Sequence, residues 1–268
     1  MKMIGEKING TRKQVGAAIA ARDADFIRNL AKKQAEAGAS WLDVNAGTTP
    51  DREPDDLVWL VRLVQEAVSV PLSLDSANPR ALRAALAEVK QTPLINSISG
   101  EPERLNSVLP IAAEHGCEVI ALAMDAKGIP GDAASRMAVV RCLLAATRAA
   151  GLPDEKVYVD PLVMTIATNT ECGRIALDTI RAVRAEYPRA HISTGLSNIS
   201  FGLPARSLIN RTFLTLAVAA GMDTAIVDPL DRELKAALLA ANLLLGADKH
   251  CLSYTRAFRA GLLETAKA

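Results

Sequence analysis

The chain has 268 residues, of which 50% are hydrophobic, and its formal net charge at pH 7 is +1. This charge balance and an aromatic content of only 3% argue against a nucleic-acid surface or an anionic membrane as the partner. No apolar run has the length of a membrane span, and the N-terminus lacks the apolar block of a signal peptide. We therefore expect a cytoplasmic protein without a membrane anchor.

The cysteines and histidines are too dispersed to suggest a metal site. No Cys-x-x-Cys pair is present, so the simplest interpretation is a reduced protein with buried thiols at positions 117, 142, 172 and 251. The three histidines lie far from one another in the sequence. The sequence therefore predicts no metal cofactor.

Short apolar strands alternate with helix-length segments along the whole chain. Several helical patterns end in Gly, which is the expected stop signal, before a polar link and the next strand. The expected strands are residues 3–8, 41–45, 72–75, 94–96, 119–123, 157–160, 191–194 and 224–228. Eight such units predict a closed parallel (β/α)8 TIM barrel that forms a single domain over residues 1–268.

The helical segments carry apolar stripes with a helical period. Residues 57–68 and 82–89 are examples, and Asn78-Pro79 supplies an N-cap followed by proline at the first helical position. Two further helical patterns, residues 232–245 and 253–266, follow the eighth strand. They predict the last barrel helix and one additional helix.

Most of the expected strands end in a carboxylate or a carboxamide. Because the carboxyl ends of barrel strands meet at one face, these side chains should line a common mouth. They are Glu6, Asn9, Asp43, Asn45, Asp75, Asn96, Asp125, Asp160, Asn198 and Asp228. Such a set can present paired acceptors and donors to a planar, nitrogen-rich heterocycle such as a pterin.

The stretch from Gly195 to Pro204 is the most conspicuous of these strand ends. Gly195 and Gly202 permit a close approach of the backbone to a ligand, and Asn198 between them offers an amide that can donate and accept. A plain turn between a strand and a helix would explain the glycines equally well.

Other interpretations of the strand ends remain open. Asp43, Asp125 and Asp228 are expected to be helix caps or turn residues rather than ligand contacts. A Schiff-base aldolase would need a buried lysine at a strand end, and only Lys7 lies near one. The Gly195–Gly202 turn loosely fits the glycine-rich turn of a phosphate-binding barrel, so phosphate is a minor alternative. Neighbouring carboxylates could hold Mg²⁺, although no motif supports a metal site.

Seven motifs, taken together and in order, resemble the methyltetrahydrofolate:corrinoid-protein methyltransferases, within the pterin-binding group that includes dihydropteroate synthase. The motifs are spread over nearly the whole chain. They are IGEKING at 4–10, LDVN at 42–45, LDS at 74–76, INS at 95–97, VDPL at 159–162, GLSN at 195–198 and LINRTF at 208–213.

The resemblance implies a dihydropteroate synthase-like TIM barrel that binds the pterin of tetrahydrofolate or 5-methyltetrahydrofolate. It places Asp75, Asn96 and Asp160 on the pterin ring, with Gly195 and Ser197 as further folate-binding residues. Asn198 is then the catalytic residue, which also binds the folate and activates N5 by a hydrogen bond. It further implies possible supporting roles for Glu6, Asn9, Asp43, Asn45, Phe201 and Arg206. Arg206 and Arg211 could meet the folate tail, but solvated or ion-paired arginines are the expectation.

By this resemblance the enzyme moves a methyl group between the folate and the cobalt of a separate corrinoid protein, and it is a homodimer. The chain lacks the corrinoid-binding motif Asp-x-His-x-x-Gly, so the corrinoid (cobalamin) belongs to the partner. Phe201 stands where some relatives serving the acetyl-CoA pathway have glutamine, which favours a role in demethylation of quaternary amines or methoxyaromatics. The alternatives are a dihydropteroate synthase-like enzyme, whose first loop and basic anion-binding motif are not evident here, and a non-catalytic folate-binding subunit.

Overall fold

The computed structural model describes residues 1–263. Its eight strands form one sheet in the order β7-β6-β5-β4-β3-β2-β1-β8, and every paired neighbour is parallel. The strands are β1 (Lys2–Asn9), β2 (Trp41–Asn45), β3 (Leu72–Asp75), β4 (Leu94–Gly100), β5 (Glu118–Asp125), β6 (Val157–Asp160), β7 (His191–Ile192) and β8 (Thr224–Val227). The predicted barrel and all eight predicted strands are confirmed.

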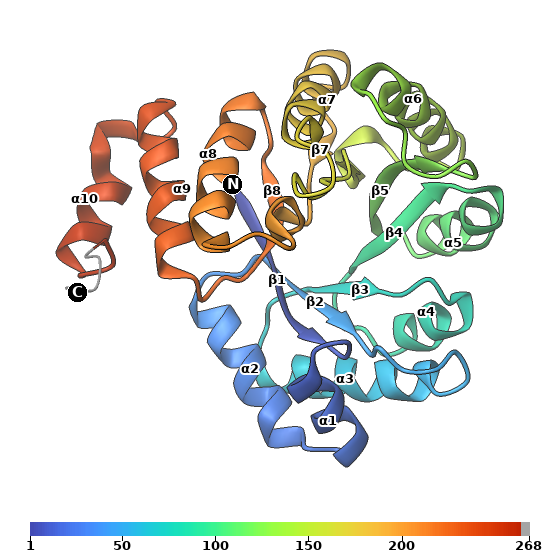
Figure 1. The fold of residues 1–268 in the computed structure, drawn as a ribbon. Coiled ribbons are helices and arrows are strands. Elements are labelled where there is room, and N and C mark those ends of the chain that lie inside the picture. The colour runs from blue at the N-terminus through green and yellow to red at the C-terminus, as the bar shows by residue number, and fades with distance from the viewer. Residues whose placement is uncertain (264–268) are drawn as a thin grey trace.

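Helices surround the strands on the outside (Figure 1). They are α1 (Lys13–Ala21), α2 (Ala24–Glu36), α3 (Glu53–Ala67), α4 (Pro79–Leu86), α5 (Pro102–Glu114), α6 (Ala133–Ala149), α7 (Cys172–Glu186), α8 (Arg206–Ala220), α9 (Arg232–Leu244) and α10 (Leu252–Arg259). Short 3-10 helices are η1 (Asp154–Lys156), η2 (Leu196–Ser200) and η3 (Lys249–Cys251). In Figure 1, α10 lies beyond α9 at the outer edge of the ring.

The ends of several elements differ from the sequence prediction. β4 and β5 extend further than expected, and the last helix ends at Arg259 rather than continuing through residue 263. The remainder of that predicted helix, residues 264–266, lies outside the described residues. Asn78 caps α4 as predicted, because its side chain accepts a hydrogen bond from the backbone N–H of Arg80 at 3.0 Å.

The interior of the barrel is apolar at its amino-terminal end and polar towards its carboxyl end. Inward-facing residues at the start of five strands form a separate buried cluster: Ile4, Trp41, Leu94, Ile120 and Tyr158. The larger apolar core lies between the strands and the helices. Closer to the carboxyl ends of the strands, an inward-facing side chain can be polar only if it has a hydrogen-bond partner or faces the mouth, because an unpaired buried polar group is costly.

Two glycines set the distance between the loops that follow β1 and β2. A side chain on Gly10 would meet the carbonyl oxygen of Ala46 at 1.9 Å, and one on Gly47 would meet the backbone of Gly10 at 2.5 Å. The Gly10 N–H donates to the carbonyl of Asn45 at 2.8 Å. These contacts hold the ends of the first two strands together at the mouth.

The seam between β7 and β8 has few ladder bonds, because β7 has only two residues. Backbone hydrogen bonds from Asp223 N to Ile192 O at 3.3 Å and from Ile226 N to Thr194 O at 2.9 Å join the two segments. The Asp223 carboxylate adds a further bond, because it accepts from the Ile192 N–H at 3.1 Å. The barrel is thus closed partly by a side chain.

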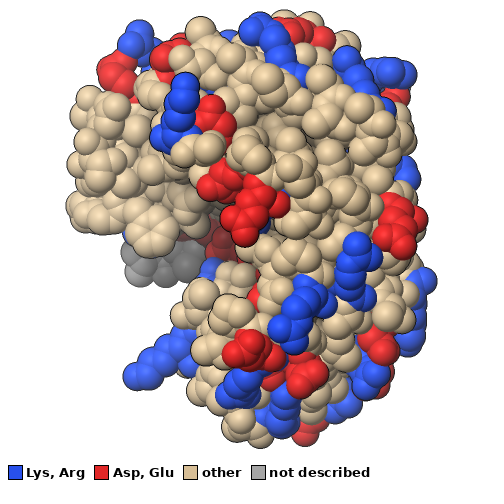
Figure 2. Space-filling view, turned by 90° about the vertical axis from the view of Figure 1, so that its right-hand side faces the viewer, with Lys and Arg blue, Asp and Glu red and all other residues tan. Residues whose placement is uncertain are grey.

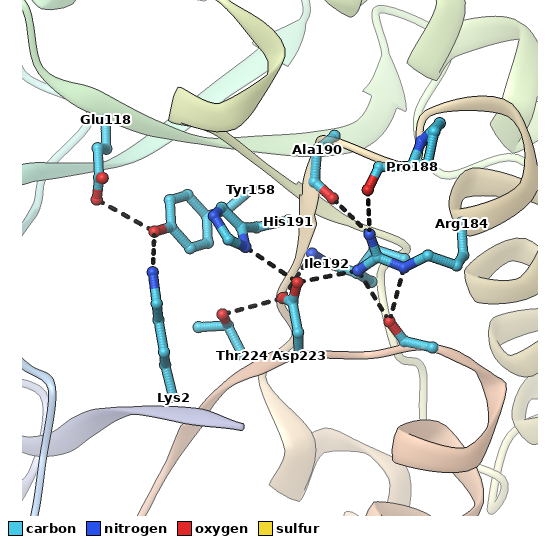
Figure 3. Close-up of polar contacts among 11 residues, drawn as sticks. Lys2, Glu118, Tyr158, Arg184, Pro188, Ala190, His191, Ile192, Asp223 and Thr224 are labelled. Carbon is cyan, nitrogen blue, oxygen red and sulfur yellow. Dashed lines mark hydrogen bonds and ion pairs between the residues drawn. The ribbon is translucent and has the colours of Figure 1, made fainter. Parts of the chain in front are cut away.

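A polar network surrounds Asp223 at the amino-terminal end of the barrel (Figure 3). His191 Nδ1 lies 2.9 Å from the carboxylate, and Arg184 Nη2 donates to it at 2.9 Å. The His191 ring stacks on Tyr158 with 4.6 Å between ring centroids. The Tyr158 hydroxyl in turn accepts from Lys2 at 3.3 Å and donates to Glu118 at 3.2 Å. No sequence pattern predicted this network.

Two further observations concern the burial of the cysteine thiols and the length and apolar character of the helices. Cys117 and Cys172 are buried, whereas Cys142 and Cys251 are exposed, so the expectation of four buried thiols is wrong. Within residues 1–263, no helix has the length and apolar character that crossing a membrane would require.

Candidate functional site

Four of the predicted strand-end residues form two hydrogen-bonded pairs inside the mouth, and the carboxyls of the two pairs are close enough to repel each other. Asp43 accepts from the Ser73 hydroxyl at 2.7 Å and from the Asn96 amide at 3.2 Å. Asn45 donates its amide to Asp75 at 2.9 Å. The prediction that Asp43 is a cap or turn residue is therefore wrong, because its carboxylate links the inward-facing side chains of β2, β3 and β4.

The hydrogen bonds of this cluster fix which atoms remain free. Asn45 and Asn96 both use their NH₂ groups within the cluster, so their carbonyl oxygens are left to accept. The side-chain oxygen of Asn45, Oδ1, is buried and has no hydrogen-bond partner among the described residues. A buried acceptor without a donor is costly unless a ligand supplies one. The cluster therefore fits a ligand edge that is rich in N–H donors.

The electrostatics of the cluster agree with this reading. Burial, together with repulsion from Asp75, holds the pKa of Asp43 well above its usual range, against the hydrogen bonds from Ser73 and Asn96. Burial also raises the pKa of Asp75, and Glu53 adds to this, whereas the Asn45 hydrogen bond and Arg104 oppose it. Donors from a ligand would stabilise the ionised forms of both carboxylates.

Asp160, at the end of β6, is the third predicted pterin contact. Burial raises its pKa to about 6, although the N–H groups of Leu162 and Gly195 and the charge of Arg136 lower it. The Leu162 N–H donates to its carboxylate at 2.7 Å, and Leu162 itself has a φ of 60°. The register of the strands places Leu122 of β5 beside Asp160, so Asp160 stands apart from the Asp43 cluster along the mouth.

Arg136 of α6 holds the loop that follows Asp160, a role that the sequence did not reveal. Its guanidinium is buried and donates to the carbonyls of Pro161 at 2.7 Å and of Leu162 at 2.8 Å. These bonds stabilise the left-handed backbone at Leu162. A buried arginine that satisfies backbone carbonyls has no distinct sequence signature, because helical arginines are usually on the surface.

Asn198 lies in the 3-10 helix η2 that follows β7. Its side chain is exposed and forms no hydrogen bond with the described residues, so both its donor and its acceptor are free. A side chain on Gly195 would come within 3.0 Å of the Asn198 amide nitrogen. Gly195 thus makes room for the Asn198 amide, and its own N–H faces Asp160.

Arg206 fixes the loop that carries Asn198. It donates to the Ser197 carbonyl at 2.9 Å and to the Ser200 hydroxyl at 3.0 Å, and its guanidinium lies 4.5 Å from the Phe201 ring centroid. The expectation of a solvated or ion-paired arginine is wrong for Arg206, but it is confirmed for Arg211, which pairs with Glu233.

A cleft of about 670 Å³ opens at the rim of the mouth. Six of the predicted site residues are among those that line it: Glu6, Asn9, Ser197, Asn198, Phe201 and Arg206. The pterin contacts expected at Asp75, Asn96 and Asp160 are not among its lining residues and lie deeper along the strands. In Figure 2 the outline of the molecule is hollowed on its left side, with acidic side chains in the hollow.

The remaining rim residues are largely engaged with one another. Glu6 pairs with Arg12 at 2.7 Å, and burial raises its pKa against the effect of Arg12. Asn9 accepts from the N–H of Thr11 at 3.0 Å, as a turn residue does. The predicted turn role holds for Asp125 and Asp228, which accept from the backbone two residues ahead at 2.8 Å and 3.0 Å.

Within the described part of the chain, no group of three or more His, Cys, Asp or Glu side chains is arranged to hold a metal ion. The carboxylates of the mouth bind amides, hydroxyls and backbone N–H groups instead. The protein is thus a parallel α/β barrel with a polar pocket at the carboxyl ends of its strands. A pocket so rich in hydrogen-bond acceptors suits a nitrogen-rich ring.

Comparison with known families leads to the same class of protein. The family model for pterin binding enzymes matches residues 5–228, and the chain belongs to this family. It is 40% identical over 270 residues to a methylcorrinoid:tetrahydrofolate methyltransferase of Eubacterium limosum, and the alignment covers 100% of both proteins. It is 32% identical to a methionine synthase of Mycobacterium tuberculosis, over 84% of this chain and 20% of that protein.

Solved structures show the same barrel. Dihydropteroate synthase from Yersinia pestis matches with a TM-score of 0.67 at 18% identity, over 92% of each chain. Dihydropteroate synthase from Xanthomonas albilineans, in complex with 7,8-dihydropteroate, matches with a TM-score of 0.63 at 20% identity, over 93% of each chain. At these identities the likeness concerns the fold.

Proposed function

We propose that this protein is a methyltransferase that moves a methyl group between 5-methyltetrahydrofolate and the cobalt of a separate corrinoid protein. The observation that carries the proposal is the mouth of the barrel, where the buried side-chain oxygen of Asn45 lacks a donor and the Asn198 amide at the rim is unpaired among the described residues. The full-length relative that acts as a methylcorrinoid:tetrahydrofolate methyltransferase supports it.

Asp75, Asn96 and Asp160 are the proposed contacts of the pterin ring. The free oxygens of Asp75 and Asn96 accept from N–H donors of the ring, because Asn45 and Asp43 hold these side chains in place. The Asp160 carboxylate suits the guanidine-like edge, where two N–H donors can meet two oxygens. Binding of that edge favours the ionised form of Asp160 and lowers its pKa from about 6.

Asn198 is the proposed catalytic residue. Transfer from a tertiary amine has a poor leaving group, so N5 must gain positive character as the carbon–nitrogen bond breaks. An amide cannot serve as a general acid, but its NH₂ group can donate a hydrogen bond to N5 in the transition state. Arg206 holds the carbonyl of the preceding residue and thereby fixes the position of this amide.

The cobalt that takes or gives the methyl group is supplied by the partner's corrinoid. This chain leaves Asn198 exposed at the rim cleft, which gives a large cofactor on another protein access to N5. We further propose that residues 1–268 form one pterin-binding domain. A cytoplasmic location, without a nucleic-acid or membrane partner, and a homodimeric assembly complete the proposal.

Methyl exchange between methylcobalamin and tetrahydrofolate, with purified protein under anaerobic conditions, tests the function. We expect 5-methyltetrahydrofolate to form at a rate proportional to the protein concentration. Folate binding without transfer, even with corrinoid proteins supplied, would favour a non-catalytic folate-binding subunit. Formation of dihydropteroate from a pterin pyrophosphate and p-aminobenzoate would favour a dihydropteroate synthase, and the absence of any pterin binding would overturn the assignment.

A further inference from the structure

A buried hydroxyl group lies at the residue that directly follows β7. Ser193 is 0% exposed, and its Oγ has no hydrogen-bond partner among residues 1–263. The Ser193 N–H donates to the Val159 carbonyl at 3.0 Å, so this residue continues the ladder between β6 and β7. A buried polar group without a partner is costly, and such a group in a native fold calls for an explanation.

The pairing of β6 with β7 places the Ser193 side chain inside the barrel. His191 is paired with Tyr158, which belongs to the buried interior cluster, and the two rings stack there (Figure 3). Successive side chains of a strand point to opposite faces, so the residues two positions further along, Asp160 and Ser193, also face the interior. The same register sets these two residues side by side. The Ser193 hydroxyl therefore lies on the inner wall of the mouth, next to Asp160.

This hydroxyl differs in kind from the side chains that are proposed to contact the ring below the rim. Asp75 and Asp160 carry carboxylates, and Asn96 has only its oxygen left, because its NH₂ group donates within the mouth. A ligand atom that accepts hydrogen bonds finds no donor at these three side chains. The Ser193 hydroxyl can donate to such an atom.

The atoms of a reduced pterin follow one another in an order that matches the order of the residues. Along one edge of the ring, the N3–H donor is followed by the 4-oxo oxygen and then by N5. Under the proposed function, Asp160 accepts from the N3–H and the Asn198 amide donates to N5. Asp160 ends β6, Asn198 lies in η2 after β7, and β7 is the neighbour of β6. The 4-oxo oxygen, which lies between the two contacts, therefore falls beside Ser193.

We propose that Ser193 is a specificity-determining residue of the pterin site, whose hydroxyl donates a hydrogen bond to the 4-oxo oxygen of the folate ring. The contact gives a partner to the buried hydroxyl and a donor to a ring oxygen that would otherwise lie among acceptors. The site thereby selects ligands that carry a strong acceptor at ring position 4. This inference rests on the proposed function, because the oxygen belongs to the pterin.

Binding of two ligands tests the contact. Tetrahydrofolate and its 4-thio analogue share the N3–H and the 2-amino group, but sulfur accepts hydrogen bonds more weakly than oxygen does. We expect Ser193→Ala to weaken the binding of tetrahydrofolate about tenfold and to change the Kd of the 4-thio analogue by less than about twofold. Anaerobic titration calorimetry measures both values. Equal losses for the two ligands, or an unchanged Kd for tetrahydrofolate, would overturn the inference.

Ser99→Ala is the matched control, because it makes the same change at an equally buried serine. Ser99 is 0% exposed in β4, and its hydroxyl donates to Glu101 at 2.9 Å. We expect this variant to bind both ligands as the wild type does. A loss of tetrahydrofolate affinity as large as that of Ser193→Ala would show that the effect does not depend on the position of the hydroxyl.

Infrared spectroscopy of bound tetrahydrofolate, isotopically labelled at its 4-oxo group, observes the hydrogen bond itself. A hydrogen bond weakens the carbonyl bond, so its stretching frequency should be higher in Ser193→Ala than in the wild type. Ser99→Ala should leave the frequency unchanged. The same frequency in Ser193→Ala and the wild type would show that the hydroxyl does not donate to this oxygen.

The stability of the free protein gives a measurement that needs no ligand. Since the Ser193 hydroxyl has no partner in the described chain, Ser193→Ala should be at least as stable to urea as the wild type. A clear loss of stability would show that the hydroxyl is paired within the protein, against this inference. A wild-type protein that binds no tetrahydrofolate would refute the proposed function. Equal binding by wild type and Ser193→Ala would refute the role of Ser193 alone.

Discussion

Buried carboxyl groups at the two ends of the barrel have pKa values that are shifted in opposite directions. At the amino-terminal end, Asp223 receives hydrogen bonds from Arg184, Ile192 and Thr224 and pairs with His191, and its pKa is lowered although burial alone would raise it (Figure 3). At the mouth, burial outweighs the available donors, and the pKa values of four carboxyls are raised: Glu6, Asp43, Asp75 and Asp160.

The difference separates a structural site from a binding site. Donors supplied by the protein make the Asp223 network stable without any ligand, and the network closes the seam beside the short strand β7. The protein donors to the carboxyls of the mouth do not offset the effect of burial, so the ionised forms become more favourable when a ligand brings further donors. Stability is concentrated at one end of the barrel and function at the other.

The largest expected effect is that of removing the Asn198 amide. Asn198→Ala should lower the rate of methyl transfer by about 10²–10³, because it removes a donor that acts on N5 in the transition state. The folate Kd should stay within about tenfold of the wild-type value, since the ring contacts remain. Stopped-flow kinetics at saturating folate measure the rate. Equal losses of binding and rate would show that Asn198 positions the folate and is not the catalytic residue.

The next largest effect concerns Asp160, the carboxylate that accepts hydrogen bonds from the pterin ring. Asp160→Ala should weaken folate binding by about 10- to 100-fold, because the donor edge of the pterin loses a charged partner. Titration calorimetry with tetrahydrofolate measures the change. An unchanged Kd would remove Asp160 from the binding site. Asp125→Ala is a suitable control, since Asp125 is a turn residue whose side chain accepts from the backbone of Lys127.

A change at the opposite end should alter stability rather than binding. Asp223→Ala leaves Arg184 and His191 without their carboxylate, and it should lower the free energy of unfolding by roughly 2 kcal/mol. Urea denaturation measures this loss, and the folate Kd of the folded variant should equal that of the wild type. A large loss of folate affinity at full stability would break the division between the two ends.

The smallest effect concerns pH. The pKa of Asp160 in the free protein is about 6, and the ionised form is the one that binds the donor edge. Folate affinity should therefore fall as the pH is lowered below about 6, by up to tenfold per pH unit. Comparison of Kd values for wild type and Asp160→Asn across this range isolates the contribution. If the two pH profiles coincide, Asp160 is not the titrating group.

Stability depends on the same titrations with opposite signs at the two ends. Asp160 binds its proton more tightly in the folded state, so its contribution to stability decreases as the pH rises from about 4 to about 6. Asp223, with a lowered pKa, contributes stability above its unfolded pKa, and this is lost as the pH falls below it.

The sequence predicted the barrel and the residues of the mouth because both leave local patterns. Alternation of short apolar strands with helices gives the fold, and a polar residue at each strand end gives the mouth. Partner choice leaves no such pattern. Asp43 and Asp125 look alike at the ends of their strands, yet Asp43 binds Ser73 and Asn96 of other strands, whereas Asp125 caps a turn.

Longer-range contacts were missed for the same reason. Arg136 and Arg206 both lie near the start of a helix and look like surface residues, but each reaches a loop that carries a site residue. The Asp223 network joins residues from Lys2 to Thr224, which come together only when the barrel closes. Such contacts depend on the three-dimensional arrangement of the strands and not on local sequence.

A crystal structure with bound tetrahydrofolate tests the account most directly. We predict that the pterin ring lies in the mouth, with its donors on Asp75, Asn96 and Asp160 and its N5 within hydrogen-bond distance of the Asn198 amide. A pterin bound in the rim cleft alone, without hydrogen bonds to those three side chains, would contradict the assignment of the mouth as the binding site.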